Sequence, residues 1–394
     1  MGLSDASDPQ DLPSLIKPGG KIDEAALRQR IATSDSDEGD DAELRRVRFE
    51  LQRDLKEQRL DRYLTTRIDF LSRSKLQKLI EDGGVLVNTQ ACKPSTKLRA
   101  GDVVEVVVPP PPDRGTTPED IPLDVLYEDE HLIVLNKQAD IIVHPARSEN
   151  TGTMTNALAY HFLHRSQTGG ALSTVGDEFA RPGVVHRLDR DTTGCIVFAK
   201  HDETHWKLGH QFEHRQVDKR YVAFVQGRVE PDVDVIEFPI GPHPSKQKGY
   251  REKQVVRHDE LGKNAVTICR VLERYRSHSR AVDDQWFSLV ELELRTGRTH
   301  QIRVHLSHLG WPIVGDDMYG GRAFAFGKDD TFSRQALHAA LLGFMHPIAQ
   351  ERTKFVAPLP DDIMQLMRTF RTFDVVERVN AAGSWIDPDQ LIAS

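Results

Sequence analysis

A short charged segment between two apolar runs contains the residue types that could do chemistry. Residues 183–200 read GVVHRLDRDTTGCIVFAK, so apolar residues precede the charges and a second apolar run starts at Cys195. A plain hairpin turn needs only Gly, Asn or Asp, so this surplus of charge requires another explanation. Asp189 and Asp191 could be the paired carboxylates of a glycosidase, but such pairs normally come from separate elements that flank the sugar.

Other reactive patterns in the chain are incomplete. The segment HDETH (201–205) has Asp202 where a zinc protease requires Glu, and GRAFAFGK (321–328) has the wrong glycine spacing for a phosphate-binding loop. The three cysteines, Cys92, Cys195 and Cys269, are far apart, which argues against a disulfide framework or a C-x-x-C zinc site and favours a reducing compartment. We therefore expect neither a metal ion nor a cofactor.

Longer motifs resemble one enzyme family. The segment HRLDRDTTG (186–194) resembles the H-R-L-D-x-x-T-[ST]-G signature of the RluA-type pseudouridine synthases. DKRYVAFVQG (218–227) is similar to the K-x-Y-x-A-x-V-x-G strand of that family, and LRTGRTHQIRVHLSHLGWPIVGD (294–316) is similar to its G-R-[ST]-H-Q-[IL]-R-x-H segment. The motifs occur in the family's order, and the similarity extends from about residue 121 to residue 375.

The resemblance implies a site and a reaction. It makes Asp189 the catalytic carboxylate, Tyr221 a ring on which the target uracil stacks, and Arg303 the charged partner that holds Asp189 ionised. Arg187 is expected to replace the displaced base in the RNA stack, although a structural ion pair is the alternative. The reaction breaks the N1–C1′ bond of a uridine and rejoins the base through C5, after the nucleotide is drawn out of the stack.

Three histidines accompany these residues. His186 precedes Arg187 and is counted with the substrate-binding residues, although its ring could instead be hydrogen-bonding scaffold, as expected for His300 and His305. The chain also departs from the family, which usually continues its N-K dipeptide as N-K-P-x-G, whereas residues 136–140 read NKQAD. This departure puts the backbone after Lys137 in question and leaves the catalytic motif intact.

Short strands and amphipathic helices are expected around these motifs. Residues 123–127, 132–136, 220–225 and 286–294 have the pattern of strands, and helices are expected around Leu208 and around Ile302, the second ending at Gly310. Because strands and helices do not alternate regularly, we expect an α+β fold with a mixed, largely antiparallel sheet flanked by helices.

A basic module precedes the catalytic region. Residues 58–108 contain nine Arg and Lys against six Asp and Glu, and the segments RLDRYL (59–64), SRSKLQKLIEDGGVLVN (72–88) and KLRAGDVVEV (97–106) together resemble an S4 RNA-binding module. A solvated helix face is the plainer interpretation of these charges. The resemblance implies five candidates for contacts to RNA phosphates, namely Arg59, Arg62, Arg73, Lys75 and Lys78.

The 394 residues are thus expected to form five parts. Residues 1–56, which include the acidic run SDSDEGDDAE (34–43), are expected to be a flexible arm, and residues 57–108 to be the S4-like domain. Residues 109–120, which begin with PPPP, are expected to be a stiff linker. Residues 121–375 would be the catalytic domain and residues 376–394 a C-terminal tail.

RNA is the partner that these features imply. The net charge of −8 argues against a nucleic-acid partner at first, but six acids belong to the acidic run. Large-subunit ribosomal RNA is the favoured substrate and transfer RNA the alternative, while a non-catalytic RNA-binding protein and a nucleoside or glycoside hydrolase represent other classes. No run approaches the ~18 apolar residues of a membrane span. We expect a cytoplasmic monomer without a required protein partner.

Overall fold

The structure is a computed structural model, and contacts divide the chain into two compact units with a boundary between Gly115 and Thr116. No helix in the part of the chain that the structure describes is long and apolar enough to cross a membrane. The described residues are 16, 17, 20–23, 26, 27, 46–51, 58–68, 71, 73–108, 116–145, 151–173, 175, 182–245, 253–277 and 285–393.

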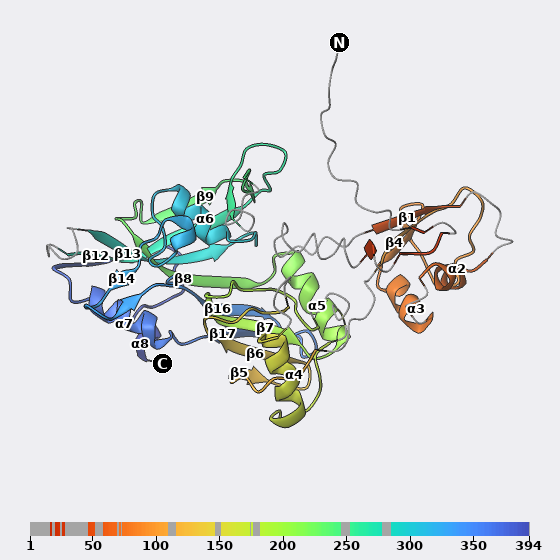
Figure 1. The fold of residues 1–394 in the computed structure, drawn as a ribbon, viewed down its shortest axis with the longest axis horizontal. Helices are drawn as coiled ribbons and strands as arrows, with labels where there is room; N and C mark the ends of the chain where they lie inside the picture. Colours follow the sequence, from red (N-terminus) through yellow and green to blue (C-terminus); the bar gives the residue numbers. More distant parts are fainter. Residues whose placement is uncertain are drawn as a thin grey trace, which may run out of the picture. The chain divides into compact units, whose positions relative to one another are not determined.

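The N-terminal unit packs two helices against a small antiparallel sheet (Figure 1). Its helices are α2 (Leu60–Arg67) and α3 (Arg73–Glu81). Its strands β1 (Arg46–Glu50), β4 (Val103–Val107), β2 (Val85–Val87) and β3 (Gln90–Ala91) follow one another in that order across the sheet. The core is made by the helix positions that recur every three or four residues, such as Leu60, Leu64, Leu76 and Ile80.

This unit begins earlier than the sequence suggested. Strand β1 lies within the expected arm of residues 1–56, yet it pairs with β4 and buries Val47 and Phe49, while Arg48 and Glu50 alternate toward solvent. Ile22 and Leu27 are buried as well. The assignment of residues 1–56 to an arm is therefore wrong for these described residues, and the acidic run 34–43 lies outside them.

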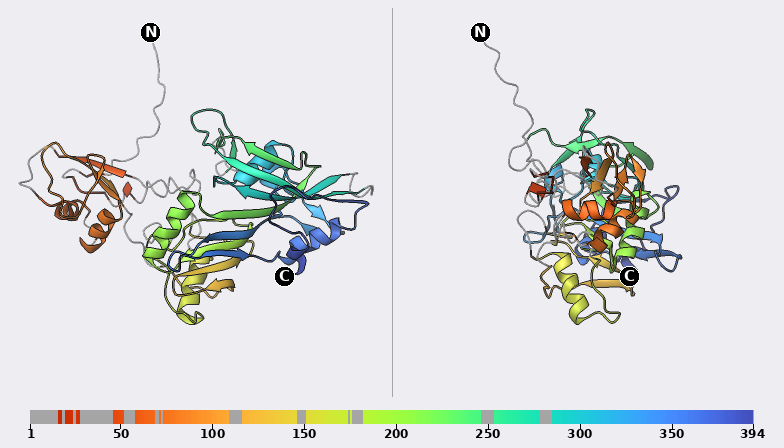
Figure 2. Two further views of the ribbon diagram at one scale, coloured as in Figure 1. Left: turned by 180° about the vertical axis from the view of Figure 1, so that it is seen from behind. Right: turned by 90° about the vertical axis from the view of Figure 1, so that its right-hand side faces the viewer.

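A ten-stranded sheet forms the centre of the C-terminal unit (Figures 1 and 2). Its main path runs in the order β18-β12-β13-β8-β16-β7-β6-β5, with β17 beside β16 and β9 beside β12, and every pair except β16 with β7 is antiparallel. The expected mixed, largely antiparallel sheet is thus confirmed. The strands are β5 (Asp124–Glu128), β6 (Leu132–Lys137), β7 (Thr193–Ala199), β8 (Asp218–Gln226), β9 (Val233–Glu237), β12 (Val266–Arg276), β13 (Trp286–Leu294), β16 (Leu337–Met345), β17 (Arg352–Val356) and β18 (Val375–Arg378).

Helices cover both faces of this sheet. Strand β8 alternates, so that Tyr221 projects from one face and Phe224 from the other. Phe224 packs against Phe370 of α7 (Asp361–Phe370), whereas α6 (Gln301–His308) contacts β12 through the hydrogen bond between His305 and Thr267. The remaining helices of this unit are α4 (Met154–His164), α5 (Asp202–Glu213) and the short α8 (Gln390–Ala393).

Both ends of the expected catalytic domain extend further than predicted. Part of the expected linker belongs to this unit, because Asn156 donates a hydrogen bond to the carbonyl of Thr117 and Glu119 bonds the backbone of Gly152; residues 109–115 lie outside the described part. The expected tail contains β18, and it buries Ile386 and Leu391 in the core. Residues 376–391 are therefore an integral part of the domain, since β18 pairs with β12 and Ile386 and Leu391 are buried.

Candidate active site

The loop 187–192 enters strand β7 at Thr193 and is fixed from two sides. The apolar residues before it form a single bridge, between Val184 and Phe198, so the described residues 182–186 form no strand. Lys137 of β6 is buried, and its ammonium donates to the carbonyls of Arg190 at 2.6 Å and Thr192 at 3.0 Å. The loop backbone is thus attached to the strand beside β7.

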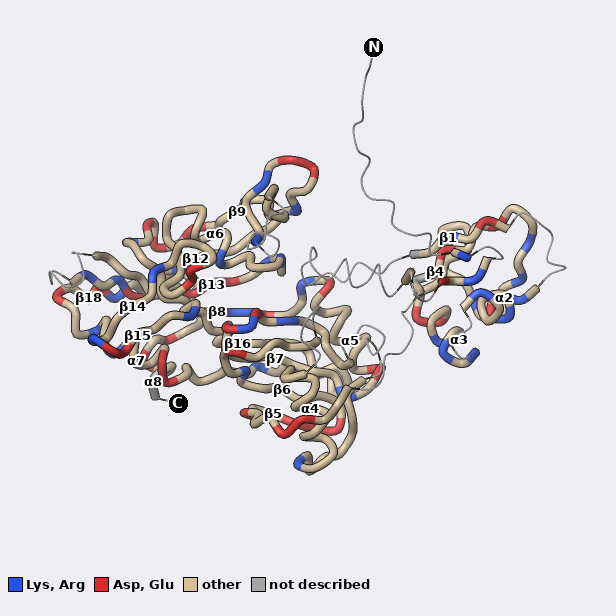
Figure 3. The backbone as a smooth tube through the Cα atoms, in the orientation of Figure 1, with Lys and Arg blue, Asp and Glu red and all other residues tan. Residues whose placement is uncertain are grey.

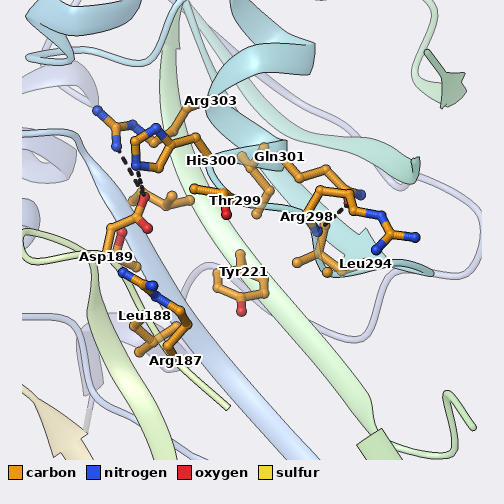
Figure 4. Close-up of a pocket in the computed structure, with 14 residues that line it drawn as sticks. Arg187, Leu188, Asp189, Tyr221, Leu294, Arg298, Thr299, His300, Gln301 and Arg303 are labelled. Atoms are coloured by element: carbon orange, nitrogen blue, oxygen red, sulfur yellow. Dashed lines mark hydrogen bonds and ion pairs between the residues drawn. The ribbon is translucent and has the colours of Figure 1, made fainter. Parts of the chain in front are cut away.

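Asp189 and Arg303 meet at the mouth of a pocket (Figure 4). Arg303 donates from Nη1 to Oδ2 of Asp189 at 3.1 Å, and Nε2 of His300 lies 3.8 Å from the same oxygen. All side-chain hydrogen bonds and ion pairs of Asp189 with described residues involve Oδ2. The second oxygen, Oδ1, is therefore available to a bound substrate.

A second carboxylate lies behind Arg303. Asp316 accepts from Nε of Arg303 at 2.7 Å and from Nη2 at 2.9 Å, and the ring of Tyr319 lies 4.8 Å from the guanidinium carbon. The hydroxyl of Tyr319 in turn contacts Nδ1 of His300 at 2.8 Å. Asp316 is the last residue of the motif at 294–316, yet no role was predicted for it or for Tyr319, because a turn residue 13 positions after Arg303 has no periodicity that would bring it there.

The charges of the site keep Asp189 ionised. Burial alone would raise the pKa of Asp189, but His300, Arg303 and Arg187 outweigh it and lower the pKa to about 2. Burial lowers the pKa of His300 to about 4, so this ring is neutral at neutral pH. Arg303 is accordingly the permanent positive partner that contacts Asp189, and the carboxylate form dominates under physiological conditions.

Tyr221 and Arg187 line the same pocket. Tyr221 lies on β8 opposite Leu292, and its ring is buried beside the loop that carries Asp189 (Figure 4). Arg187 is half-buried and makes no hydrogen bond to any residue that the structure describes. The Tyr221 ring and the Arg187 guanidinium therefore line the same pocket as the Asp189 carboxylate. Both planar groups can stack on a nucleobase.

His186, predicted to bind substrate or to serve as scaffold, is not among the residues that line this pocket. Its Nε2 accepts a hydrogen bond from the backbone N–H of Val197 at 3.1 Å, and its ring stacks on Phe212 of α5 with centroids 4.5 Å apart. Burial lowers the pKa of His186 to about 3. His186 thus anchors the start of the loop to β7 as a neutral ring.

The backbone after Lys137 adopts a left-handed conformation despite the unusual residues 138–140. Asp140 has φ +57°, at the position where the family usually has Gly. Asp tolerates this region better than most residues, because its short side chain can bond locally. The departure from N-K-P-x-G therefore leaves Lys137 in place to hold the loop.

The basic residues of the N-terminal unit are organised by a buried carboxylate. Asp61 is fully buried and accepts hydrogen bonds from Arg59 at 3.1 Å, Arg73 at 2.9 Å and Gln77 at 2.9 Å. Burial would raise the pKa of Asp61, but these donors lower it well below its usual range. Asp61 was not singled out in the sequence, although it lies within the RLDRYL segment.

The predicted phosphate-binding residues line the same two helices. Figure 3 shows the basic residues of α2 and α3. Arg59 precedes α2, and its side chain is 45% exposed despite the pairing with Asp61, so its guanidinium is accessible. The side chains of Arg62, Arg73, Lys75 and Lys78 are also exposed.

Known protein families match both units of the chain. Residues 131–308 match the RNA pseudouridylate synthase family, and residues 58–104 match the S4 domain. An uncharacterized RNA pseudouridine synthase of Bacillus subtilis is 40% identical over 316 residues, which are 80% of this chain and 95% of that protein. The chain therefore belongs to the RNA pseudouridine synthase family. Membership decides against a non-catalytic RNA-binding protein and against a hydrolase.

A more specific name is attached to other relatives. A protein of Zymomonas mobilis named ribosomal large subunit pseudouridine synthase D is 39% identical, over 79% of this chain and 93% of its own length. Among solved structures, human RNA pseudouridylate synthase domain containing 4 is 26% identical with a TM-score of 0.48, over 65% of this chain and 95% of that chain. This chain is an RNA pseudouridine synthase with an S4 domain, and RNA is its partner.

Proposed function

We propose that this enzyme converts uridine to pseudouridine in large-subunit ribosomal RNA, with Asp189 as the catalytic carboxylate. The observation that carries the proposal is the asymmetry of Asp189, a residue that lines the pocket: its Oδ2 is held by Arg303, while its Oδ1 has no hydrogen-bond or ion-pair partner among the described residues. The choice of RNA rests on the names of relatives such as the Zymomonas mobilis protein. Transfer RNA is the alternative substrate.

The proposed chemistry needs an ionised carboxylate beside the ribose. The N1–C1′ bond of uridine breaks and a C5–C1′ bond forms, while C5 loses its proton and N1 gains one. Asp189 can attack C1′ as a nucleophile or remove a proton from the sugar as a base, and both roles require the low pKa that Arg303 maintains. Tyr221 would hold the uracil ring and, through its hydroxyl, assist the proton transfer at C5.

A uridine inside a helix cannot reach this pocket, so the enzyme would flip it out of the stack. Arg187 would then occupy the vacated space, since its planar guanidinium stacks on bases and donates hydrogen bonds. The S4 domain would add sequence-independent contacts to phosphates through the basic residues of α2 and α3. We place the protein in the cytoplasm, as a monomer that needs no protein partner.

Mapping of pseudouridine in total RNA tests the proposal. RNA from a strain that lacks the protein, and from the same strain complemented with wild-type or Asp189→Asn protein, would be treated with a carbodiimide that blocks reverse transcription at pseudouridine. We expect one or more stops in large-subunit ribosomal RNA that require the wild-type protein and that Asp189→Asn does not restore. Stops confined to transfer RNA would instead identify the alternative substrate.

A further inference from the structure

Two residues that do not contact Asp189 lie directly behind its two neighbours. Asp316 binds Arg303, and Tyr319 binds His300, and both come from the turn at residues 315–319. We propose that Asp316 and Tyr319 are positioning residues for the isomerisation: Asp316 determines which edge of Arg303 faces Asp189, and Tyr319 determines which nitrogen of His300 carries the proton. The proposal rests on the catalytic role proposed for Asp189.

Asp316 occupies the two-donor edge of the Arg303 guanidinium. It is 1% exposed, and it accepts from Nε and Nη2 in the bidentate geometry that makes such pairs strong. The other side of Nη2 faces Sδ of Met318 at 3.9 Å, and Nη1 reaches Asp189 with a single bond. A guanidinium released by Asp316 could turn its Nε/Nη2 edge to Asp189 and engage both carboxylate oxygens. Asp316 therefore keeps Oδ1 of Asp189 available to the substrate.

Tyr319 determines the tautomer of His300. The backbone N–H of Gln254 donates to the hydroxyl of Tyr319 at 2.9 Å, so the hydroxyl proton can be donated to Nδ1 of His300, 2.8 Å away. A neutral ring that accepts at Nδ1 carries its proton on Nε2. Nε2 is the atom that lies 3.8 Å from Oδ2 of Asp189, so the carboxylate faces an N–H group instead of a lone pair.

The turn that carries both residues is attached rigidly to its surroundings. Gly315 has φ +80°, and a Cβ atom there would lie 2.0 Å from the carbonyl oxygen of Arg334, so no other residue fits without a shift of the backbone. Ser307, four residues after Arg303 on α6, donates to the carbonyl of Tyr319 at 2.7 Å. The spacing between the turn and Arg303 is thereby fixed.

Other charged groups among the described residues near this site are Arg187 on the same loop, Lys137 on β6, Arg298 in the pocket lining and Lys253, whose ammonium lies 5.3 Å from the ring centroid of Tyr319. All four stay unchanged in the variants below. Changes in rate and in the His300 tautomer therefore report on Arg303 and His300, the two groups that Asp316 and Tyr319 contact.

The test of Asp316 measures isomerisation by the release of tritium from C5 of uridine. The substrate is total RNA from a strain lacking the protein, grown with uridine tritiated at C5, so that the unmodified target is present whichever RNA contains it. We expect Asp316→Asn to lower the single-turnover rate about 100-fold with little change in the apparent affinity for RNA. The matched control is Asp317→Asn, which makes the same charge change at the exposed neighbour in the same turn.

Tyr319→Phe provides an independent readout. The variant keeps the ring beside Arg303 and removes only the hydroxyl. His300 can then take either tautomer, and the nitrogen chemical shifts of its ring report which one is present. We expect a single-turnover rate that is lower by about tenfold and a mixture of both His300 tautomers, whereas the control Tyr127→Phe keeps the wild-type rate and a His300 ring protonated on Nε2.

Two outcomes would overturn the inference. One is an Asp316→Asn rate equal to that of Asp317→Asn, and the other is a His300 ring in Tyr319→Phe that stays protonated on Nε2 alone, as in Tyr127→Phe. If Asp316→Asn does not fold, as judged by thermal unfolding, Asp316→Glu replaces it with the same expected loss, because its carboxylate is displaced by one methylene. Asp189→Asn separates the two proposals: activity in that variant contradicts the proposed function, whereas an inactive Asp189→Asn beside a fully active Asp316→Asn contradicts only this inference.

Discussion

Arg303 donates a hydrogen bond from Nη1 to Oδ2 of Asp189 across 3.1 Å, although the two residues are 114 positions apart in the sequence. One residue comes from the loop before β7 and the other from helix α6. The pair gives the site an ionised carboxylate. One of its oxygens, Oδ2, is bound by Arg303, and the other, Oδ1, is available to a substrate.

Asp189→Asn should fold normally and abolish pseudouridine formation. Asn keeps the size and part of the hydrogen bonding of Asp, but it can act neither as a nucleophile nor as a base. Affinity for RNA should change little, because phosphate contacts supply most of it. Thermal unfolding, RNA binding and tritium release would be measured on the same preparation, and substantial turnover by the variant would refute the assignment.

Arg303→Ala should make the rate sensitive to acid. Loss of a positive neighbour at this distance raises the pKa of a carboxylate by roughly 1–3 units, so the pKa of Asp189 should move up from about 2. A group whose pKa rises is protonated at higher pH, and the acid limb of the rate profile should therefore move upward by the same amount. Arg298→Ala, which removes another arginine of the same pocket, is the control. An acid limb at the wild-type position would contradict the pairing.

Tyr221→Phe should bind RNA and slow the chemical step. Phe keeps the stacking surface and removes the hydroxyl, and proton transfer by a positioned group is worth roughly 100–10,000-fold in rate. Single-turnover rates and dissociation constants separate the two effects, with Tyr127→Phe as the control at an exposed site. A wild-type rate for Tyr221→Phe would limit this residue to stacking.

The exposed lysines of α3 should contribute salt-sensitive RNA binding. In the full chain, Lys75→Gln with Lys78→Gln should weaken binding and reduce the slope of log affinity against log salt by about 0.7–0.9 for each phosphate that the protein no longer neutralises. Arg48→Gln is a matched control, because Val47 and Phe49 face the helices from β1 and Arg48 faces the opposite side of the sheet. Equal slopes for the lysine variant and the control would show that Lys75 and Lys78 make no contact with RNA phosphates.

Asp140→Gly should stabilise the enzyme by roughly 0.5–1 kcal/mol, because Gly adopts the left-handed conformation of this residue without steric cost. The ion pair with Arg190 is long, at 3.7 Å, and exposed, so its loss offsets little. Denaturant unfolding at equilibrium measures the change, with Asp124→Gly in strand β5 as a control expected to destabilise. A loss of stability in Asp140→Gly would show that the side chain of Asp140 bonds its own backbone.

The sequence predicted the parts of this structure that depend on local pattern. The strand at residues 286–294 was predicted with its observed limits, because its residues alternate regularly between the two faces. Strand β1 was missed, because it has charged residues at three of its five positions, like the polar segment before it. Its two apolar residues, Val47 and Phe49, are too few to give a clear strand pattern, although both are buried. The ends of the catalytic domain were missed for a similar reason, since Ile386 and Leu391 are isolated apolar residues that are buried only by tertiary contacts.

Some residues of the candidate site could be predicted from sequence motifs, and others could not. Asp189, Tyr221 and Arg303 lie in motifs long enough to be recognised, and the structure brings all three to one pocket. Asp316 and Tyr319 act through contacts between a turn and a helix, which residue spacing does not encode. The position of His186 could not be predicted either, because the orientation of its ring depends on Phe212 of a separate helix.

The place of β16 in the sheet has a consequence for synthesis of the protein. Strand β16 is inserted between β7, which follows the loop 187–192, and β8, which carries Tyr221. Gly194, the second residue of β7, packs so closely on Ala339 of β16 that a Cβ atom would lie 2.3 Å from the carbonyl oxygen of Ala339. A growing chain cannot join these strands until residues 337–345 have left the ribosome. The chain must therefore be translated through residue 345 and beyond before Asp189 has a rigid support, and nascent chains that lack β16 should have no isomerase activity.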